Sequence, residues 1–244
     1  MPARLTGIPA SHPVLAAELM LEFKGVPYVR RDLPTQLQKL VLPLLGYPER
    51  SVPVLRIDGI RVQGSTRIAR VLEGLAPVPA LFPSEHAARR RVEELEAWAD
   101  VNLQETVRKL ARWAAKCDPA AVGPIAAASD IPVSERLLAR VVPPLAPLLL
   151  STVRTSREQA RTALDGLRTG LDRVDAAIAE GVIGGEQPNA ADFQVASCVR
   201  LATLIDDLQP LLAGRPAAAL AHRLAPRYPG RFSAPLGLEP PAQG

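Results

Sequence analysis

The chain has 244 residues, of which 48% are apolar and 4% aromatic, and its net charge is +4 at pH 7. This length accommodates one large domain or two small ones, each with a core built mainly from Leu, Ala and Val. No apolar run is long enough to cross a bilayer, and the first residues lack the apolar stretch of a signal peptide. The densest basic cluster, Arg89-Arg90-Arg91, is followed at once by acidic residues, which indicates a solvated helix face. We therefore expect neither a nucleic acid nor a membrane among the partners.

The first part of the chain predicts short strands alternating with helices. Residues 3–8 predict a strand, and a Pro-Ala-Ser-His-Pro turn follows it. From Val14 onwards, apolar residues at helical spacing predict a helix that ends at Gly25. Residues 26–33 predict a second strand and residues 35–45 a second, Leu-rich helix.

The segment 51–72, SVPVLRIDGIRVQGSTRIARVL, predicts a strand, a tight turn, a second strand and a helix opened by Gly64-Ser65. A proline near the start of a strand removes a ladder donor, and a cis Val52-Pro53 bond would explain its presence. That geometry would leave the backbone groups of Val52 free to pair with an extended peptide. Because a helix start offers unpaired N–H groups to a carboxylate, the segment predicts a site for a small anionic peptide.

The remainder of the chain predicts helices. A Pro-rich linker leads into a charged and apolar run over residues 84–116, and residues 155–180 predict a second amphipathic helix. Asn189 followed by Asp192 resembles a capping box at the start of a third helix. Between them, the proline-punctuated residues 141–150 cannot continue a helix, so we expect a shorter helix over 134–142 followed by a rigid turn.

Three motifs in order give the first part a family resemblance. They are Ser11 followed by Lys24-Gly25-Val26-Pro27-Tyr28, the step Val52-Pro53-Val54-Leu55, and Gly64-Ser65 with Ile68. The chain thereby resembles the serine- or cysteine-type cytosolic glutathione S-transferases, as a divergent member, over about residues 3–225. The resemblance implies an α+β thioredoxin-like N-terminal domain followed by an all-α C-terminal helical domain. The expected limits are 1–75 for the thiol-binding domain, 76–83 for a linker, 84–230 for the helical substrate domain and 231–244 for a Pro-rich tail.

The resemblance implies that Ser11, at the mouth of the first helix, donates a hydrogen bond to the glutathione sulfur and favours the reactive thiolate. The alternative is an ordinary capping or turn serine. His12 follows it and could polarise the thiol or an electrophile, or could simply face solvent in the turn.

The same resemblance implies roles for the cis-proline step and the third helix. Val52 would pair with the cysteinyl part of glutathione while Pro53 fixes that geometry, although thioredoxin-like folds also keep this proline for shape alone. Ser65 would bind the γ-glutamyl carboxylate, or else serve only as a helix cap. Gly64 departs from the family pattern, because relatives carry an acidic residue or Gln there for the ligand ammonium. Gln63 lies one place earlier, and its side chain can point elsewhere.

A cation for the glycyl carboxylate and a pocket for the second substrate are also implied. Arg50 and Lys39 are the candidate cations, although either side chain could equally be a plain surface charge. Arg112 and Trp113 are the candidates for the substrate pocket, although Trp113 could equally be core packing. No metal is expected.

Three functions remain open on the sequence. The first is a detoxifying transferase or isomerase that adds glutathione, or a related low-molecular-weight thiol, to an electrophilic small molecule. The second is a thiol oxidoreductase, which is disfavoured because the turn before the first helix has no cysteine. The third is a non-catalytic binding or assembly module, or a groove adapted to another ligand. The predominance of arginine over lysine suggests a GC-rich genome, in some of which other thiols replace glutathione.

Compartment and assembly complete the expectations. Cys117 and Cys198 are far apart and offer no disulfide framework, which favours a reducing cytoplasm. By resemblance we expect a homodimer, in which the last helix of the first domain contacts the long helix of the partner.

Overall fold

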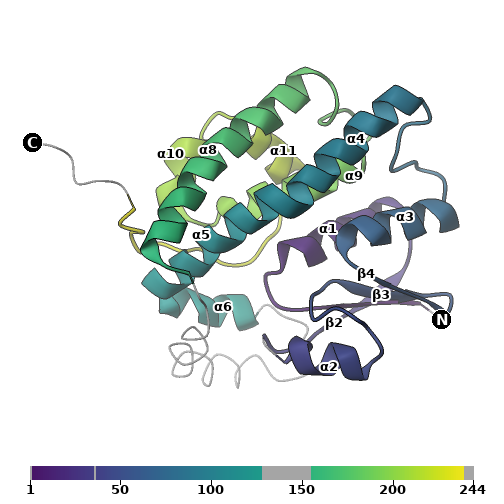
Figure 1. Cartoon of the computed structure of the whole chain (residues 1–244), viewed down its shortest axis with the longest axis horizontal. Helices are drawn as coiled ribbons and strands as arrows, with labels where there is room; N and C mark the ends of the chain where they lie inside the picture. Colours follow the sequence, from purple (N-terminus) through teal and green to yellow (C-terminus); the bar gives the residue numbers. More distant parts are fainter. Residues whose placement is uncertain (1, 36, 128–154, 239–244) are drawn as a thin grey trace, which may run out of the picture.

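A computed structural model describes residues 2–35, 37–127 and 155–238 (Figure 1). The helix and turn predicted within 134–150 lie outside these residues. The predicted fold class is confirmed, because a four-stranded mixed sheet with its helices is followed by a helical region. Among the described helices, none is both long and apolar enough to span a bilayer.

The sheet has the order β2-β1-β3-β4. Strand β1 (Ala3–Gly7) pairs in parallel with β2 (Tyr28–Asp32) and antiparallel with β3 (Val54–Ile57), which in turn pairs antiparallel with β4 (Ile60–Gln63). Asp58 and Gly59 join the last two strands, and both have positive φ, as a type I′ hairpin turn requires.

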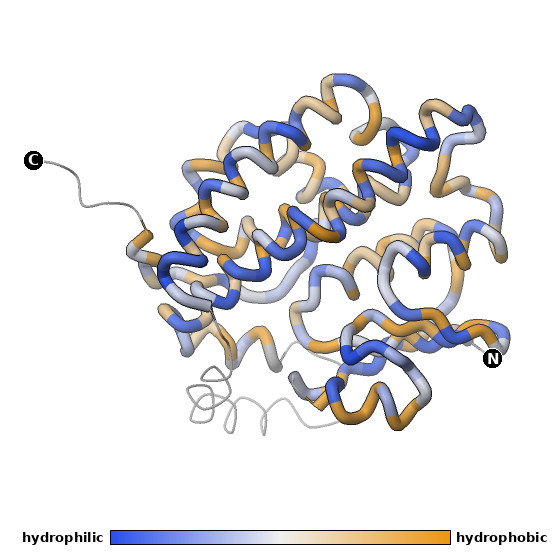
Figure 2. Tube along the Cα trace, in the orientation of Figure 1, coloured by the Kyte–Doolittle hydropathy of each residue, from blue (hydrophilic) through white to orange (hydrophobic). Residues whose placement is uncertain are grey.

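Helices cover both faces of the sheet. Helices α1 (His12–Phe23) and α3 (Ser65–Leu75) pack side by side on the face toward the helical region, whereas α2 (Gln38–Leu44) lies on the opposite face (Figure 1). Helix α2 is largely hydrophobic in colour (Figure 2), and Leu40 and Leu44 are exposed on it. The site residues described below lie at the N-terminal ends of α1 and α3.

The close approach of α1 to the sheet depends on a glycine. A Cβ on Gly7 would lie 2.8 Å from Cγ1 of Val14 and 2.9 Å from Oδ1 of Asp32. A side chain at this position therefore forces α1 and the end of β2 apart, which would displace the mouth of α1.

The helical region surrounds one central helix. Its members are α4 (His86–Trp98), the π-helical turn η1 (Ala99–Leu103), α5 (Gln104–Cys117), the 3₁₀ turn η2 (Pro119–Ala121), α6 (Val122–Ala127), α8 (Arg157–Ala179), α9 (Ala190–Ala202), the 3₁₀ turn η3 (Asp206–Leu208), α10 (Gln209–Leu212) and α11 (Pro216–Leu224). Every residue of α9 is buried, and the helix packs against α1, α4, α5 and α11. The predicted capping box of Asn189 and Asp192 is confirmed. Asp192 also accepts the Gly184 N–H at 2.7 Å, which fixes the loop before the helix.

Two contacts tie the N-terminal domain to the helical region and its linker. The rings of Phe23 on α1 and Phe193 on α9 lie 5.4 Å apart. The buried ammonium of Lys24 binds the carboxylate of Glu73 and the carbonyl of Ala76 (2.6 Å), so it joins the end of α1 to the end of α3. The predicted domain limits stay a prediction, although α3 ends at Leu75 and α4 begins at His86.

The residues expected to form a Pro-rich tail are packed against the helical region as far as they are described. Phe232, Leu236 and Leu238 are buried, and Phe232 forms a parallel bridge with Ile205. The carboxylate of Asp118 accepts the N–H groups of Ser233 and Ala234. Sequence patterns missed this segment because its apolar residues follow neither the helical nor the strand period.

Candidate functional site

The mouth of α1 presents a serine whose hydroxyl does not cap the helix. Ser11 is the N-cap residue, in extended conformation, and Pro13 occupies the first turn of the helix. Within the described part of the chain, the Ser11 side chain makes no capping hydrogen bond. Its hydroxyl therefore lies beside the unpaired N–H groups and the positive end of a 12-residue helix. This arrangement can hold an anion or a thiolate.

His12 is a buried neutral residue and does not face solvent. It is only 3% exposed, and its Nε2 has no hydrogen-bond partner among the described residues. Burial lowers the pKa of its imidazole to about 3, and the positive charges of Arg108 and Arg112 lower it further. His12 therefore carries no charge at neutral pH, and it cannot act there as an imidazolium acid.

The Val52-Pro53 bond is cis, as predicted. The carbonyl of Pro53 accepts the N–H of Gly64 at 2.9 Å, which fixes the proline loop to the start of α3. Among the described residues, no backbone hydrogen bond uses the N–H or C=O of the half-buried Val52. These groups are available to an extended peptide, and the pairing of Val52 with a ligand stays a prediction.

Ser65 begins α3, and Gly64 is the N-cap residue with a φ of 92°. The Ser65 side chain is buried, and its hydroxyl donates to Oε1 of Gln194 at 2.9 Å. Nε2 of Gln194 donates in turn to Oδ1 of Asp100 at 3.2 Å. The Ser65 hydroxyl is thus engaged with the helical region, and the backbone N–H groups at the start of α3 remain for an anion.

Gln63 holds the loop before the proline step in place. Its Nε2 donates to the carbonyls of Glu49 (2.8 Å) and Ser51 (2.7 Å), and its Oε1 accepts the Glu49 N–H at 3.1 Å. All these bonds are to protein backbone, so the side chain of Gln63 does not replace the one that Gly64 lacks. Its role is to position the residues that precede Val52.

The two candidate cations for a glycyl carboxylate, Arg50 and Lys39, are exposed. Arg50 lies in the loop just before the proline step, and Lys39 is the second residue of α2. Neither forms an ion pair among the described residues, and their contact with a ligand stays a prediction.

The two substrate-pocket candidates on α5 have different surroundings. Arg112 is exposed, and the pKa of its guanidinium is lowered by partial burial and by the like charge of Arg108. Nε1 of Trp113 donates to the carbonyl of Leu236 at 2.9 Å. The polar edge of Trp113 therefore binds the C-terminal segment, whereas the guanidinium of Arg112 has no ion-pair partner in the described residues.

Two residues of the site, Gln194 and Asp100, were not predicted from the sequence. Gln194 stands on a helix that shows no polar face, since every residue of α9 is buried. Asp100 lies in η1, and burial raises the pKa of its carboxyl. A single π-helical turn inside a long helix often marks a functional position, yet its sequence reads as ordinary helix.

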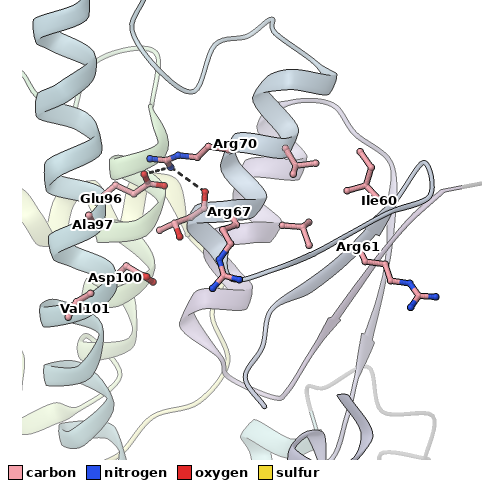
Figure 3. Close-up of a pocket in the computed structure, with 11 residues that line it drawn as sticks. Ile60, Arg61, Arg67, Arg70, Glu96, Ala97, Asp100 and Val101 are labelled. Atoms are coloured by element: carbon pink, nitrogen blue, oxygen red, sulfur yellow. Dashed lines mark hydrogen bonds and ion pairs between the residues drawn. The ribbon is translucent and has the colours of Figure 1, made fainter. Parts of the chain in front are cut away.

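A cavity of about 580 Å³ lies between α3, β4 and α4, and Asp100 of the Ser65 network is among the residues that line it (Figure 3). Arg70 reaches across it from α3 and binds the carboxylate of Glu96 on α4, and its guanidinium also donates to the Thr66 carbonyl at 3.2 Å. Glu96 is 1% exposed, and burial raises the pKa of its carboxyl to about 7. Arg61 points away from this pair (Figure 3), and its guanidinium donates to the Leu45 carbonyl at 3.2 Å.

Comparison with known families settles the identity of the first domain. Residues 5–80 match the family model described as the glutathione S-transferase N-terminal domain. The chain carries a glutathione S-transferase N-terminal domain. The resemblance seen in the three sequence motifs is thereby confirmed for the part of the chain that contains them.

Solved glutathione transferases extend the likeness in fold to the helical region. Glutathione transferase F7 from Populus trichocarpa has a TM-score of 0.64 at 13% identity, covering 92% of this chain and 94% of that chain. A glutathione S-transferase from Rhodospirillum rubrum F11 has a TM-score of 0.60 at 20% identity, covering 97% and 99%. Maleylacetoacetate isomerase from Anaeromyxobacter dehalogenans 2CP-1, with bound GSH in its active site, has a TM-score of 0.55 at 22% identity, covering 91% and 89%. A search of the curated proteins gave no match.

Proposed function

We propose that this chain is a glutathione-transferase-like enzyme that adds glutathione, or a related small thiol, to an electrophilic small molecule. The observation that carries the proposal is the hydroxyl of Ser11 at the start of α1, which makes no capping hydrogen bond among the described residues, within a glutathione S-transferase N-terminal domain. A hydroxyl in this position can donate to a sulfur atom, and a helix start favours negative charge there.

The proposed chemistry is stabilisation of a thiolate. The hydrogen bond from Ser11 and the positive end of α1 lower the pKa of the bound thiol, whose proton passes to solvent. Each unit of lowering corresponds to about 1.4 kcal/mol. The thiolate then attacks the electrophilic carbon, a C–S bond forms, and in a chlorinated substrate chloride leaves with the electron pair of the C–Cl bond. His12 contributes no proton to these steps, because its imidazole is neutral and buried.

In this proposal the thiol peptide lies along the cis-proline step. The backbone of Val52 pairs with the cysteinyl unit, Arg50 or Lys39 neutralises the glycyl carboxylate, and the N–H groups at the start of α3 receive the γ-glutamyl carboxylate. Gly64 supplies no side chain for the ligand ammonium. We therefore expect weaker binding of glutathione than a site with an acidic residue there would give.

A second candidate is a groove adapted to another ligand, or a non-catalytic binding module. The engagement of Ser65 by Gln194 and of Gln63 by the loop backbone favours it, since neither side chain is then free for a γ-glutamyl group. Both candidates share the mouth of α1, so one set of measurements separates them.

The decisive experiment combines retention on immobilised glutathione with conjugation of glutathione to chlorodinitrobenzene. We expect retention, turnover, and a loss of about tenfold or more in kcat/KM for Ser11→Ala, equivalent to about 1.4 kcal/mol of transition-state stabilisation. The kinetic pKa of the bound thiol should also rise in this variant.

Ser84→Ala is the matched control, because Ser84 is an exposed serine just before α4 and not at the start of α1. Retention without turnover would favour the binding module. Activity that survives Ser11→Ala unchanged would remove Ser11 from the reaction.

Assembly and compartment belong to the same proposal. We propose a homodimer in which α3 and β4 of one copy meet α4 of the other, at the cavity shown in Figure 3. Exposed Ile60 and Val101 beside that cavity support it, because apolar side chains gain from burial in an interface. The free thiols of Cys117 and Cys198 support a reducing, cytoplasmic location.

A further inference from the structure

A row of arginines crosses three neighbouring strands of the sheet. Arg4 of β1 pairs directly with Arg56 of β3, which pairs directly with Arg61 of β4. Residues paired in this way project from the same face of a sheet, with Cβ atoms about 4.5–5.5 Å apart. Val54, two residues before Arg56, belongs to a small apolar cluster with Leu42 of α2. Since residues two apart in a strand share a face, the arginine row lies on the face that carries α2 (Figure 1).

Helix α2 leaves this row open to solvent. Val54, which lies under the helix, is 1% exposed, whereas all three arginines of the row are exposed. Arg31 of β2 pairs with Thr6, the residue of β1 that pairs with Val54, so it adds a fourth exposed arginine to the same face. Four positive charges therefore lie on one open side of the sheet.

The carboxylates near this face do not pair with its arginines. Asp32, at the end of β2, binds Arg30 at 3.0 Å, and Glu49 binds Arg67. Asp58, in the hairpin turn between β3 and β4, is exposed and forms no ion pair within the described residues. Even with Asp58 counted, the face keeps a surplus of positive charge. Like charges directly opposite on neighbouring strands are destabilising, so the row is in place at some cost to the fold.

An apolar edge borders the row at the end of α2. The guanidinium of Arg61 donates to the carbonyl of Leu45 at 3.2 Å, so the row reaches the residue that follows α2. Leu45 is exposed, as are Leu40 and Leu44, which are four apart on the helix and so share a side of it. Leu44 is 86% exposed. The arginines and these leucines thus form one continuous surface, with a charged part and an apolar part.

We propose that this surface docks an acidic amphipathic helix of a partner protein. Neighbouring strands are about 4.8 Å apart, and carboxylates three or four residues apart on a helix are about 5–6 Å apart. A helix laid across the strands therefore places successive carboxylates against successive guanidiniums of the row, and its apolar residues against the leucines of α2. Arginine suits this role because its planar guanidinium binds a carboxylate through two parallel N–H groups. The inference is independent of the thiol chemistry, since α1 and α3 lie on the other face of the sheet (Figure 1).

Nucleic acids and anionic bilayers are the other polyanions that a basic face attracts. A nucleic acid would leave the leucines of α2 without a partner. It would also find no aromatic ring to stack on, because the single aromatic residue of the four described strands, Tyr28, bonds to Glu22 of α1. A bilayer needs no fixed spacing, whereas the strand register holds these arginines in a straight row. The spacing and the apolar edge together favour a protein helix.

The test uses a fluorescein-labelled amphipathic helical peptide of about 18 residues, five turns of helix, with Glu at every third or fourth position and Leu beside these positions. The same peptide with Gln in place of Glu is its control. By fluorescence anisotropy we expect the Glu peptide to bind the full chain at least tenfold more tightly than the Gln peptide, and less tightly as salt is added.

The double variant Arg4→Gln/Arg56→Gln should weaken binding of the Glu peptide at least tenfold. The matched control is Arg90→Gln/Arg227→Gln, which removes the same charge from exposed positions outside the sheet and should leave the affinity within about twofold. No measurable binding, equal binding of the Glu and Gln peptides, or an affinity unchanged in Arg4→Gln/Arg56→Gln would overturn the inference.

Three parallel measurements address the other occupants. Tighter binding to phosphatidylserine vesicles or to a DNA duplex than to the Glu peptide, lost in Arg4→Gln/Arg56→Gln, would assign the surface to a membrane or to a nucleic acid and overturn the inference. Sedimentation of this variant as a smaller species than the wild type would assign the surface to a second copy of the chain, with the same consequence.

Thermal unfolding at low salt tests the premise without any ligand. Arg4→Gln/Arg56→Gln should have a higher Tm than Arg90→Gln/Arg227→Gln, because it relieves the repulsion within the row. A lower Tm would show that the chain itself neutralises the row, and would also overturn the inference.

Discussion

At the scale of single residues, the site combines one free hydroxyl with several polar groups that the protein has already engaged. Ser11 and Ser65 both lie at helix starts, and from the sequence alone either one could bind a ligand or serve only as a helix cap. The structure separates them, since the hydroxyl of Ser65 donates to Gln194 whereas that of Ser11 makes no capping hydrogen bond among the described residues. The difference arises from a partner 129 positions away in the chain, which no local pattern encodes.

Gln194 is central to the hydrogen-bond network that joins Ser65 and Asp100, so we expect its replacement to reduce stability. Gln194→Ala should lower the free energy of unfolding by about 2 kcal/mol, because it leaves the buried Ser65 hydroxyl unpaired and removes a donor from Asp100. Urea unfolding of the variant measures this loss. Gln187→Ala, at an exposed position, should change the unfolding midpoint little. A Gln194 variant as stable as that control would show that the network contributes nothing to the fold.

Local rules predicted several single-residue features correctly. The cis bond at Pro53, the end of α1 before Gly25 and the capping box of Asn189 and Asp192 all follow from the geometry of one or two residues. The burial of His12 did not follow, because it depends on how α1 packs against the helical region. From sequence alone, a histidine that follows a turn serine is expected to be exposed, and only the packing of its helix shows otherwise.

At the scale of elements, the contact between α3 and α4 depends on an ion pair with one buried partner. Glu96 is almost fully buried, and the pKa of its carboxyl is raised from 4.5 to about 7 because burial outweighs the attraction of Arg70. The folded chain therefore binds a proton more tightly there than the unfolded chain does. The stability gained from protonation is complete below the unfolded pKa and is lost as the pH rises through about 7.

Glu96→Gln mimics the protonated form at every pH. We expect this variant to be close to the wild type in stability near pH 4.5, and more stable than it above pH 7 by roughly 1 to 3 kcal/mol. Thermal unfolding as a function of pH measures the difference. Glu94→Gln is the control on the same helix, since Glu94 is exposed and pairs only weakly with Arg90 at 3.7 Å. A difference between Glu96→Gln and wild type that stays constant with pH would contradict the prediction.

Most elements were predictable because their patterns are strong, and the exceptions have physical causes. The alternation of β1 and the amphipathic face of α8 are encoded locally. The division of the long run over residues 84–116 into α4, η1 and α5 is not encoded locally, since the π-helical turn contains residues such as Ala99 and Leu103 that are equally common in α-helices. The C-terminal segment was missed for a similar reason, because tertiary hydrogen bonds rather than repeats hold it.

At the scale of the whole molecule, the face that carries the cavity is the one we expect to pair with a second copy. Val101 is 67% exposed beside Glu96 and Asp100, and its side chain would be buried in the proposed homodimer. We predict a dimer by sedimentation, and a shift toward monomer for Val101→Lys, which would bring a charge into the interface and against the arginines of the partner copy.

The matched control is Val78→Lys, because Val78 is 85% exposed in the linker and away from this face. It should leave the sedimentation coefficient unchanged. A wild-type chain that sediments as a monomer would remove the proposed interface, and the thiol-transfer proposal would then have to stand on a single copy.

The bond between the Trp113 indole and Leu236 provides the molecule with an internal optical reporter. Detachment of residues 232–238 would expose that indole to water and shift its emission to longer wavelength. The other tryptophan, Trp98, lies under the guanidinium of Arg173 at 4.4 Å and has no bond to this segment. Replacing Trp98 with a non-fluorescent side chain would therefore leave a fluorescence signal that reports only on the C-terminal segment 232–238.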